Sequence, residues 1–159
     1  MSITITTKPD FRRMYGIIRE ELADGLVKCG RMVILDNTTR IDLGITPDGG
    51  PQKENSPWWQ AIKSRKRGHT TPLRYNDVLS DPHGYTINDH PAFGSIPLPK
   101  DTLKVSVGMT TRGFPPRSDV LVKLRAMGYK YWALTDSASA HCIELLKTSL
   151  STALRRITD

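Results

Sequence analysis

The sequence predicts a single α+β domain, in which a small mixed or antiparallel sheet is flanked by long N- and C-terminal amphipathic helices. Apolar residues recur at helical spacing over residues 11–28 and again over residues 136–157, which is the pattern of an amphipathic helix. Between these segments, short β-prone runs alternate with clusters of Gly and Pro, as in strands joined by turns and long loops. The two patterns together indicate helices at the ends of the chain and strands in the middle.

The length and composition bound the class of protein. A chain of 159 residues fits one domain that folds without disulfides or a metal, so we expect residues 1–159 to form a single structural domain. With 38% hydrophobic and 25% charged residues, the composition is that of a soluble globular protein and excludes collagen-like and wholly disordered classes. The net charge of +7 predicts salt-dependent attraction to nucleic acid, acidic protein surfaces or anionic lipid.

The two cysteines, Cys29 and Cys142, lie far from any C-x-x-C spacing, so neither a zinc site nor a redox motif is indicated. We expect two buried thiols in a reducing compartment, with a disulfide as the less favoured alternative. Residues 1–7 lack a cationic segment followed by an apolar one, and no run approaches the roughly 18 apolar residues that cross a bilayer. The sequence predicts a protein that stays in the cytoplasm of the cell that makes it.

The N-terminal third is expected to hold a helix and three strands. The helix of residues 11–28 is expected to end at Gly30 as a C-cap. An alternation of isoleucine and threonine predicts a strand before this helix, and two β-prone runs predict a hairpin after it. These strands are expected at residues 2–7, 31–36 and 40–45.

The remaining chain is expected to add strands and helices on both sides of a projecting loop. Three prolines predict an extended loop at residues 90–100, and the final helix is expected to begin near Asp136 or Ser137. Apolar residues at alternate positions predict a clear strand at residues 103–109. Shorter elements are a helix at residues 57–63, a strand at 85–88, a helix at 118–127 and a strand at 129–134.

The segment of residues 46–79 differs from the rest of the chain. A cluster of Gly and Pro leads into two tryptophans, then into a cationic run, and then into Pro72 and Leu73, where apolar patterning restarts. We interpret this segment as a folded excursion that the scaffold presents to partner proteins.

Trp58 and Trp59 are adjacent, so their side chains point about 100° apart on a helix and to opposite faces on a strand. They cannot both enter one core. In one interpretation, one tryptophan is buried and the other covers its own loop. In the other, one of them anchors an intersubunit contact, because Trp is enriched among interface hot spots. The sequence favours neither interpretation over the other.

The cations Lys63, Arg65, Lys66 and Arg67 fall within five positions. A solvated cationic face is the usual explanation for such a run. Contact with DNA phosphates or with an acidic partner fits the same chemistry, because guanidinium and ammonium groups bind both. Aromatic residues interleaved for base stacking are absent beyond the two tryptophans, so a protein interface is favoured over sequence-specific recognition of nucleic acid.

The sequence contains no catalytic signature, and we predict that the chain is not an enzyme. The four histidines, His69, His83, His90 and His141, show no H-E-x-x-H or H-x-H spacing, and no cofactor or metal is expected. No nucleophile elbow, phosphate-binding glycine loop or dinucleotide fingerprint is present. A small hydrolase or nuclease that uses His69 or His83 is an alternative supported by residue type alone.

The order of these signals carries a family resemblance. An amphipathic helix is followed by Asp48-Gly49, then by the two tryptophans and the basic run, then by the segment from Pro72 to Leu79, and later by a V-x-V-G strand at residues 105–108. This order resembles the neck, tail-completion and virion-morphogenesis proteins of tailed bacteriophages, in which a P-L-x-x-T-G-x-L segment occupies the position of residues 72–79. Here Asn76-Asp77 stands in place of Thr-Gly.

The resemblance implies a structural virion protein: a homo-oligomeric ring, with six-fold symmetry as one option, that joins the head connector to the tail. It implies contacts with the head connector and with tail-tube or tail-terminator proteins, and packaged DNA nearby without sequence specificity. Its location would be the virion neck, after assembly in the host cytoplasm. Expected interface residues are Trp58, Trp59, Pro72 and Leu73. The alternative is a basic nucleic-acid-binding protein, argued from the net charge and the cationic run.

Overall fold

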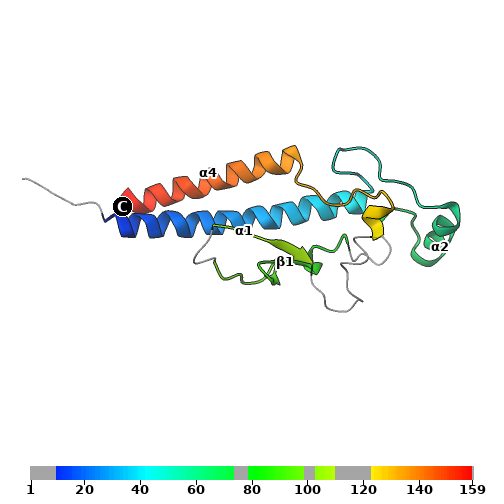
Figure 1. The fold of residues 1–159 in the computed structure, drawn as a ribbon, viewed down its shortest axis with the longest axis horizontal. Helices are drawn as coiled ribbons and strands as arrows, with labels where there is room; N and C mark the ends of the chain where they lie inside the picture. The colour runs from blue at the N-terminus through cyan, green and yellow to red at the C-terminus, as the bar shows by residue number, and fades with distance from the viewer. Residues whose placement is uncertain (1–9, 74–78, 99–102, 110–122, 159) are drawn as a thin grey trace, which may run out of the picture.

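The computed structural model describes residues 10–73, 79–98, 103–109 and 123–158. The chain forms a single α+β domain, as the sequence predicts, in which two long helices pack together beside a small antiparallel sheet. Figure 1 shows α1 (Phe11–Leu43) lying between α4 (Asp136–Thr158) and the sheet. The three layers make an elongated body, and α2 (Pro57–Arg67) projects at the end of α1 that is far from the C-terminus.

Helix α1 is almost twice as long as the sequence predicts. It begins after Asp10, whose side chain accepts hydrogen bonds from the backbone N–H groups of Arg12 and Arg13, an N-cap that satisfies two of the free donors at a helix start. It runs for 33 residues to Gly44, which adopts the left-handed conformation with φ 68° that favours glycine at a helix C-cap.

The predicted C-cap at Gly30 and the predicted hairpin at residues 31–36 and 40–45 are therefore wrong. The β-prone side chains of this region also fall at helical spacing, and Val27, Ile34 and Ile41 are all buried on one face of α1. Packing of that face against the sheet outweighs the local β preference. Gly30 lies inside the helix at a point where the sheet approaches closely. A Cβ atom there would lie 2.9 Å from Ile87 Cδ1, so a residue with a side chain would not fit without movement.

The contact between α1 and α4 is antiparallel and uses small side chains. A Cβ atom at Gly25 would lie 2.5 Å from Ser149 Oγ, so the two helices approach closely at this glycine. Further along, the thiol of Cys29 donates to the Cys142 carbonyl oxygen at 3.5 Å. Arg156 in the last turn of α4 forms ion pairs with Glu20 at 3.2 Å and Glu21 at 2.6 Å.

Both cysteines are free thiols, so the disulfide alternative is not what the structure shows. Cys29 is buried, as predicted, whereas Cys142 is partly exposed. Burial raises the pKa of the Cys29 thiol to about 12, and its contact with Cys142 acts in the same direction. Cys29 therefore has the properties of a structural thiol and lacks those of a reactive one.

The sheet has the order β2-β1-β3, with β1 (Tyr85–Ile87) antiparallel to both β2 (His90–Pro91) and β3 (Val107–Met109). Tyr85 and Ile87 pack with Ile34 of α1 and with Ala92 to form the core between the sheet and the helix.

The predicted strand at residues 85–88 is confirmed in position, and the predicted strand at 103–109 is confined to β3. Strand β2 falls within the segment predicted as an extended loop at residues 90–100. Arg31 fixes this segment, because its guanidinium donates to the carbonyl oxygens of Ala92 at 2.7 Å and Gly94 at 2.9 Å. The strand predicted at residues 2–7 lies outside the described residues.

Two further predictions concern short helices. Helix α2 is longer than the predicted helix of residues 57–63 and includes the whole cationic run. It starts after the N-cap Ser56 and ends at Gly68, which has φ 73°. Of the helix predicted at 118–127, residues 123–126 are helical and residues 118–122 lie outside the described residues.

Candidate functional site

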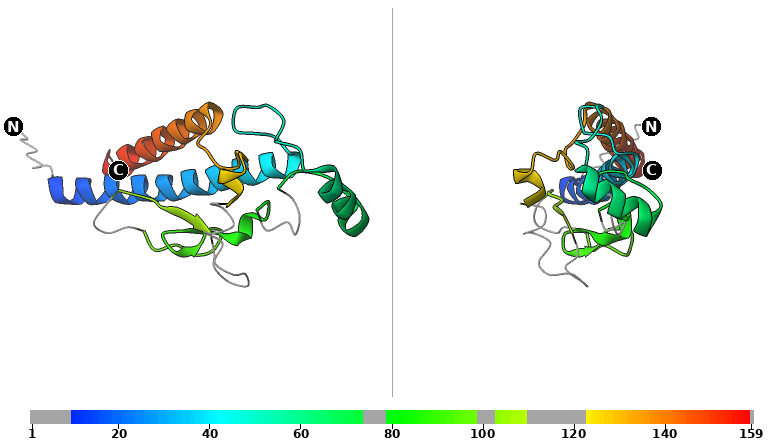
Figure 2. Two further views of the ribbon diagram at one scale, coloured as in Figure 1. Left: turned by 45° about the vertical axis from the view of Figure 1, so that its right-hand side comes forward. Right: turned by 90° about the vertical axis from the view of Figure 1, so that its right-hand side faces the viewer.

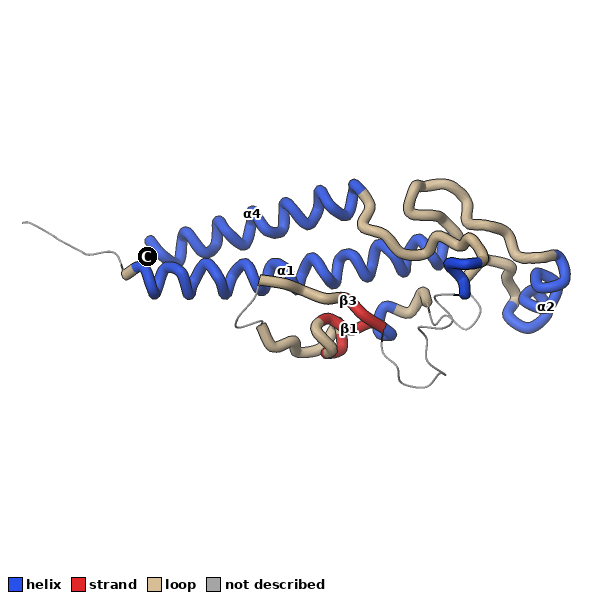
Figure 3. Tube along the Cα trace, viewed as in Figure 1, coloured by secondary structure: helices blue, strands red, loops and turns tan. Residues whose placement is uncertain are grey.

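The candidate site is the tip, which we define as residues 44–73. Figure 3 shows it as a long loop and a short helix that continue from the end of α1. A tight turn closes the first part of the loop, where the backbone N–H and the hydroxyl of Thr46 both donate to the Gly50 carbonyl oxygen, at 2.8 and 3.1 Å. The backbone N–H of Gln52 donates to the Gly44 carbonyl oxygen at 2.8 Å. The base of the tip is thus tied to the C-cap of α1.

Side-chain amides join the tip to residues 129–135. The Gln52 amide pairs with the backbone of Lys130, because its Nε2 donates to the Lys130 carbonyl oxygen and its Oε1 accepts from the Lys130 N–H at 3.2 Å. Asn55 accepts from the Tyr129 hydroxyl at 3.2 Å and donates to the Thr70 carbonyl oxygen at 3.1 Å. Both amide side chains are buried.

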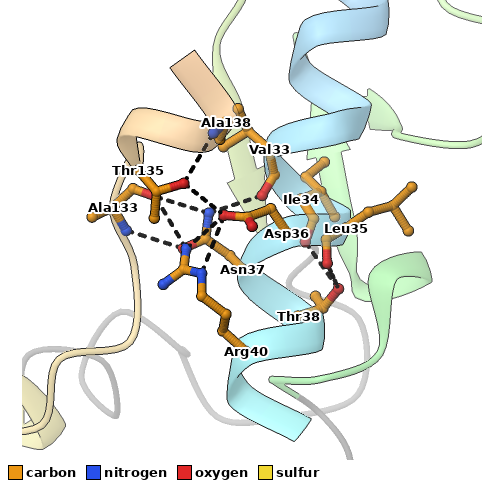
Figure 4. A network of polar contacts seen from close by, with 10 residues as sticks. All are labelled: Val33, Ile34, Leu35, Asp36, Asn37, Thr38, Arg40, Ala133, Thr135 and Ala138. Atoms are coloured by element: carbon orange, nitrogen blue, oxygen red, sulfur yellow. Dashed lines mark hydrogen bonds and ion pairs between the residues drawn. The ribbon is translucent and has the colours of Figure 1, made fainter. Parts of the chain in front are cut away.

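A third amide makes the same kind of pair from α1. The Asn37 Nδ2 donates to the Ala133 carbonyl oxygen and its Oδ1 accepts from the Ala133 N–H, each at 3.0 Å. Figure 4 shows Asn37 at the centre of this network, between α1 and the segment that leads into α4. Arg40 completes it by donating to Asn37 Oδ1 at 2.9 Å and to Asp36 at 2.9 and 3.1 Å.

The predicted strand at residues 129–134 is therefore wrong. The segment has no strand partner among the described residues, and the amides of Asn37 and Gln52 take that role by offering one donor and one acceptor each to its backbone. A carboxamide has the same donor and acceptor groups as a peptide bond, so the backbone polar groups of Lys130 and Ala133 are satisfied without a sheet.

The two tryptophans of α2 are not equivalent. Their rings stack at a centroid distance of 5.9 Å with 26° between the planes. Trp58 is 71% exposed, whereas Trp59 is half-buried. Trp58 thus presents a large apolar surface to solvent, held in place by its neighbour.

The four predicted cations of α2 also separate. Lys63 is only 1% exposed, and its ammonium group donates to the Thr71 carbonyl oxygen. Lys63 therefore holds α2 against the segment of residues 69–71 that follows it, and it cannot contact DNA or an acidic partner from this buried position. Burial lowers the pKa of Lys63 from its ordinary value of 10.5, because the charged form loses solvation.

Arg65, Lys66 and Arg67 are exposed in the last turn of α2. Cations are favourable at this end of a helix, where the unpaired carbonyl groups carry partial negative charge. Arg65 lies seven residues after Trp58, so the two side chains share one face of the helix. α2 contains no Asp or Glu, so the exposed end of the tip combines an aromatic ring with a helix whose charged side chains are all cationic.

Pro72 and Leu73, the other predicted interface residues, are partly buried. A Cβ atom at Gly44 would lie 3.5 Å from Pro72 Cδ, so this proline folds back onto the C-cap of α1. Leu73 has φ 62°, which is an uncommon conformation for a residue with a side chain. These two residues close the tip at its base, at a distance along the chain from the exposed tryptophan.

The histidines do not form a centre. His69 is half-buried, with its Nδ1 atom lacking a hydrogen-bond partner, and His83 is exposed beside the ring of Phe93 at 5.4 Å. In the part of the chain that the structure describes, no three His, Cys, Asp or Glu side chains are placed to share a metal ion. Within the same residues, no helix has the length and apolar character needed to cross a bilayer.

Comparisons with protein-family models, with curated proteins and with solved structures found no match to this chain.

Three amides that organise the site, Asn37, Gln52 and Asn55, are not among the residues predicted from the sequence. Asn37 had a detectable signal, because it lies between Ile34 and Ile41 on the face of α1 that would be buried if the helix continued past Gly30. A buried polar residue in such a position requires a partner. Gln52 and Asn55 lie in an irregular loop, where no periodic pattern indicates burial.

Replacing Asn37 tests the amide pairs. Asn37→Asp keeps the acceptor for the Ala133 N–H but removes the donor to the Ala133 carbonyl oxygen and places a charge in a buried site beside Asp36. We expect the free energy of unfolding, measured by urea denaturation, to fall by about 2–4 kcal/mol. Thr39→Asp, at an exposed position of the same helix, is the control and should change it by less than about 0.5 kcal/mol. If Asn37→Asp and Thr39→Asp lowered the free energy of unfolding equally, the pairing of Asn37 with the Ala133 backbone would not be what stabilises the fold.

Burial of Lys63 predicts a pH dependence of stability. Because its pKa is lower in the folded chain than in the unfolded chain, the unfolded state binds more protons between the two values, and stability rises with pH in that window up to about 10.5. Lys63→Met should remove this part of the rise in urea midpoint between about pH 8 and about pH 10. Lys66→Met, on the exposed side of α2, should retain it. A wild-type rise that survives in Lys63→Met would show that other groups cause it.

Proposed function

We propose that this chain is a structural subunit of the neck or tail-completion ring that joins the head connector to the tail of a tailed phage. The observation that carries the proposal is the tip, which presents a 71% exposed Trp58 on a helix with no acidic residue. The order of sequence signals resembles that class of protein and supports the same conclusion. Tryptophan is enriched among the residues that dominate protein–protein binding energy.

The arrangement of the scaffold supports a role in association. Among the described residues, the exposed large hydrophobic side chains outnumber the buried ones of comparable size, and apolar surface of that extent marks interaction sites when it is contiguous. The amides of Gln52 and Asn55 fix the tip before any partner binds. A preformed tip loses less conformational entropy on docking than a flexible loop would.

The residues of the tip take different roles in this proposal. Trp58 and Arg65 form the contact face toward the head connector or a tail-tube or tail-terminator protein. Trp59 supports the ring of Trp58 by stacking. Pro72 and Leu73 hold the base of the tip against α1, and Lys63 ties α2 to the returning chain.

Alanine replacement of each tryptophan separates docking from folding. Trp58→Ala should leave the melting temperature of the isolated chain within about 1–2 °C of wild type, because the lost side chain is mostly in solvent. It should reduce, by about tenfold or more, the yield of joined particles when the purified chain is added to phage heads and tails made without it. Trp59→Ala should lower the melting temperature.

Two outcomes would count against this assignment. If purified wild-type chain fails to join heads to tails, the proposed function is wrong. If Trp58→Ala and Trp59→Ala both lower the melting temperature and the yield in parallel, the tryptophans act in folding and the docking role of Trp58 is wrong.

The exposed cations favour a second candidate function, that of a basic nucleic-acid-binding protein. If Arg65 and Lys66 contact phosphates, each contact adds about −0.9 to the slope of log K against log salt for duplex DNA. The double variant Arg65→Gln/Lys66→Gln should then flatten the slope by about 1.8, whereas Lys147→Gln/Arg155→Gln, with the same charge change on α4, should not. If the chain is a structural subunit, its binding to duplex DNA should be weak and should be lost at about 0.15 M salt. Tight binding to duplex DNA that persists at this salt concentration would favour the second function.

A further inference from the structure

The two cysteines meet across the contact between α1 and α4. Cys29 of α1 and Cys142 of α4 are 113 residues apart in the chain, yet the Cys29 thiol donates to the Cys142 carbonyl oxygen at 3.5 Å. Burial is the main cause of the raised pKa of Cys29, and a hydrogen bond with the Cys142 side chain adds to it, so the two thiols are in contact. Both are free, and the structure therefore shows the reduced form of a neighbouring pair.

The spacing between the two helices suits a disulfide near this level. One turn before Cys29, a Cβ atom placed at Gly25 would lie 3.1 Å from Ser149 Cβ. The Cβ atoms of a disulfide are about 3.8 Å apart, so the helices already approach more closely than such a bond requires. Cys29 lies four residues after Gly25, on the same face of α1. Cys142 lies seven residues before Ser149, again on the same face of its helix. Rotation of the two side chains is thus sufficient to bring the sulfur atoms together.

The two thiols differ in their access to solvent. Cys29 is only 7% exposed, whereas Cys142 is partly exposed. An oxidant that arrives from solvent therefore meets Cys142 first. Cys29 stays protonated and does not react with such an oxidant itself, but it lies where it can act as the second partner. An accessible thiol beside a resolving thiol is the arrangement that redox-sensitive cysteines use.

We propose that Cys29 and Cys142 form a reversible disulfide that locks α1 to α4 when the protein meets an oxidising environment. The oxidant is a small disulfide of the class of oxidised glutathione. This inference goes beyond the proposed function and does not depend on it, because the lock acts on the scaffold helices and leaves the tip unchanged.

The chemistry is two successive thiol–disulfide exchanges. The Cys142 thiolate attacks one sulfur of oxidised glutathione, which forms a mixed disulfide and releases one glutathione thiolate. The Cys29 sulfur then attacks the Cys142 sulfur, and the second glutathione leaves with the proton of Cys29. Two protein thiols are oxidised to one disulfide, and one glutathione disulfide is reduced to two thiols. The second step is slow because Cys29 ionises with difficulty, and it proceeds because the two sulfurs are held together.

The disulfide would stabilise the contact between the two longest helices. That contact is narrow, since small residues such as Gly25, Ser149 and Ala153 form it. The loop closed by the disulfide contains the sheet and the whole tip. A cross-link that closes a loop of this length removes many conformations from the unfolded chain, so it raises the stability of the folded state.

The test is incubation of the purified full chain with oxidised glutathione, followed by mass spectrometry. The product should be lighter than the reduced chain by about 2 mass units, because two hydrogen atoms are lost, and neither cysteine should react with iodoacetamide. Its melting temperature should rise by about 5–10 °C, and dithiothreitol should reverse both changes.

Single replacements separate the roles of the two cysteines. Cys29→Ala should stop at the mixed disulfide on Cys142, with no rise in melting temperature. Cys142→Ala should leave Cys29 unmodified under the same conditions. Before oxidation, circular dichroism of both variants should match that of the wild-type chain.

The wild-type chain decides the inference even if a variant folds poorly. A chain that stays reduced, stops at the mixed disulfide, or links two copies through Cys142 would overturn it. An internal disulfide that leaves the melting temperature unchanged, or lowers it, would show that the bond strains the helix pair and does not lock it.

Discussion

The structure depends on buried side-chain amides that form hydrogen bonds with the backbone of residues 130–133, in the way that a neighbouring strand would. Asn37 and Gln52 each offer one donor and one acceptor to the segment that leads into α4. Without these pairs, the buried amides of Asn37 and Gln52 would lose their backbone partners, at a cost of about 1–3 kcal/mol for each unsatisfied buried group. The Gln52 pair also ties the tip to this segment, and Thr135 at the start of α4 accepts from the Ala138 N–H and donates to Asp36, so a few polar contacts link the scaffold to the candidate site.

The spacing of apolar and turn-forming residues along the chain predicts those helices and strands that do not depend on packing against a distant element. The spacing of apolar residues in α4, the short helix that begins at Pro57, and the short strand β1 are all visible in the sequence. The second half of α1 could not be predicted in this way, because its β-prone residues are held in a helix by the sheet packed against Ile34 and Gly30. Packing of the tertiary structure outweighs propensity there.

The candidate site, like the fold, could be predicted from the sequence only where a local pattern of residues indicates it. The two tryptophans and the cations of α2 are visible as a local run of residues, but this run does not indicate which tryptophan is exposed. The burial of Lys63 depends on Thr71, which lies beside the helix only because the chain turns at Gly68. The amides Gln52 and Asn55 depend on partners far along the chain. A contact between residues distant in sequence leaves no periodic signal, so these roles required the folded arrangement.

The thin three-layer body explains why apolar surface remains on the outside. Among the described elements, α1 is the helix with neighbours on two faces, with α4 on one and the sheet on the other. The contact between α1 and α4 is narrow because Gly25, Ser149 and Ala153 leave little side-chain area between the helices. Larger residues such as Leu150 and Leu154 therefore lie outside this contact and are exposed.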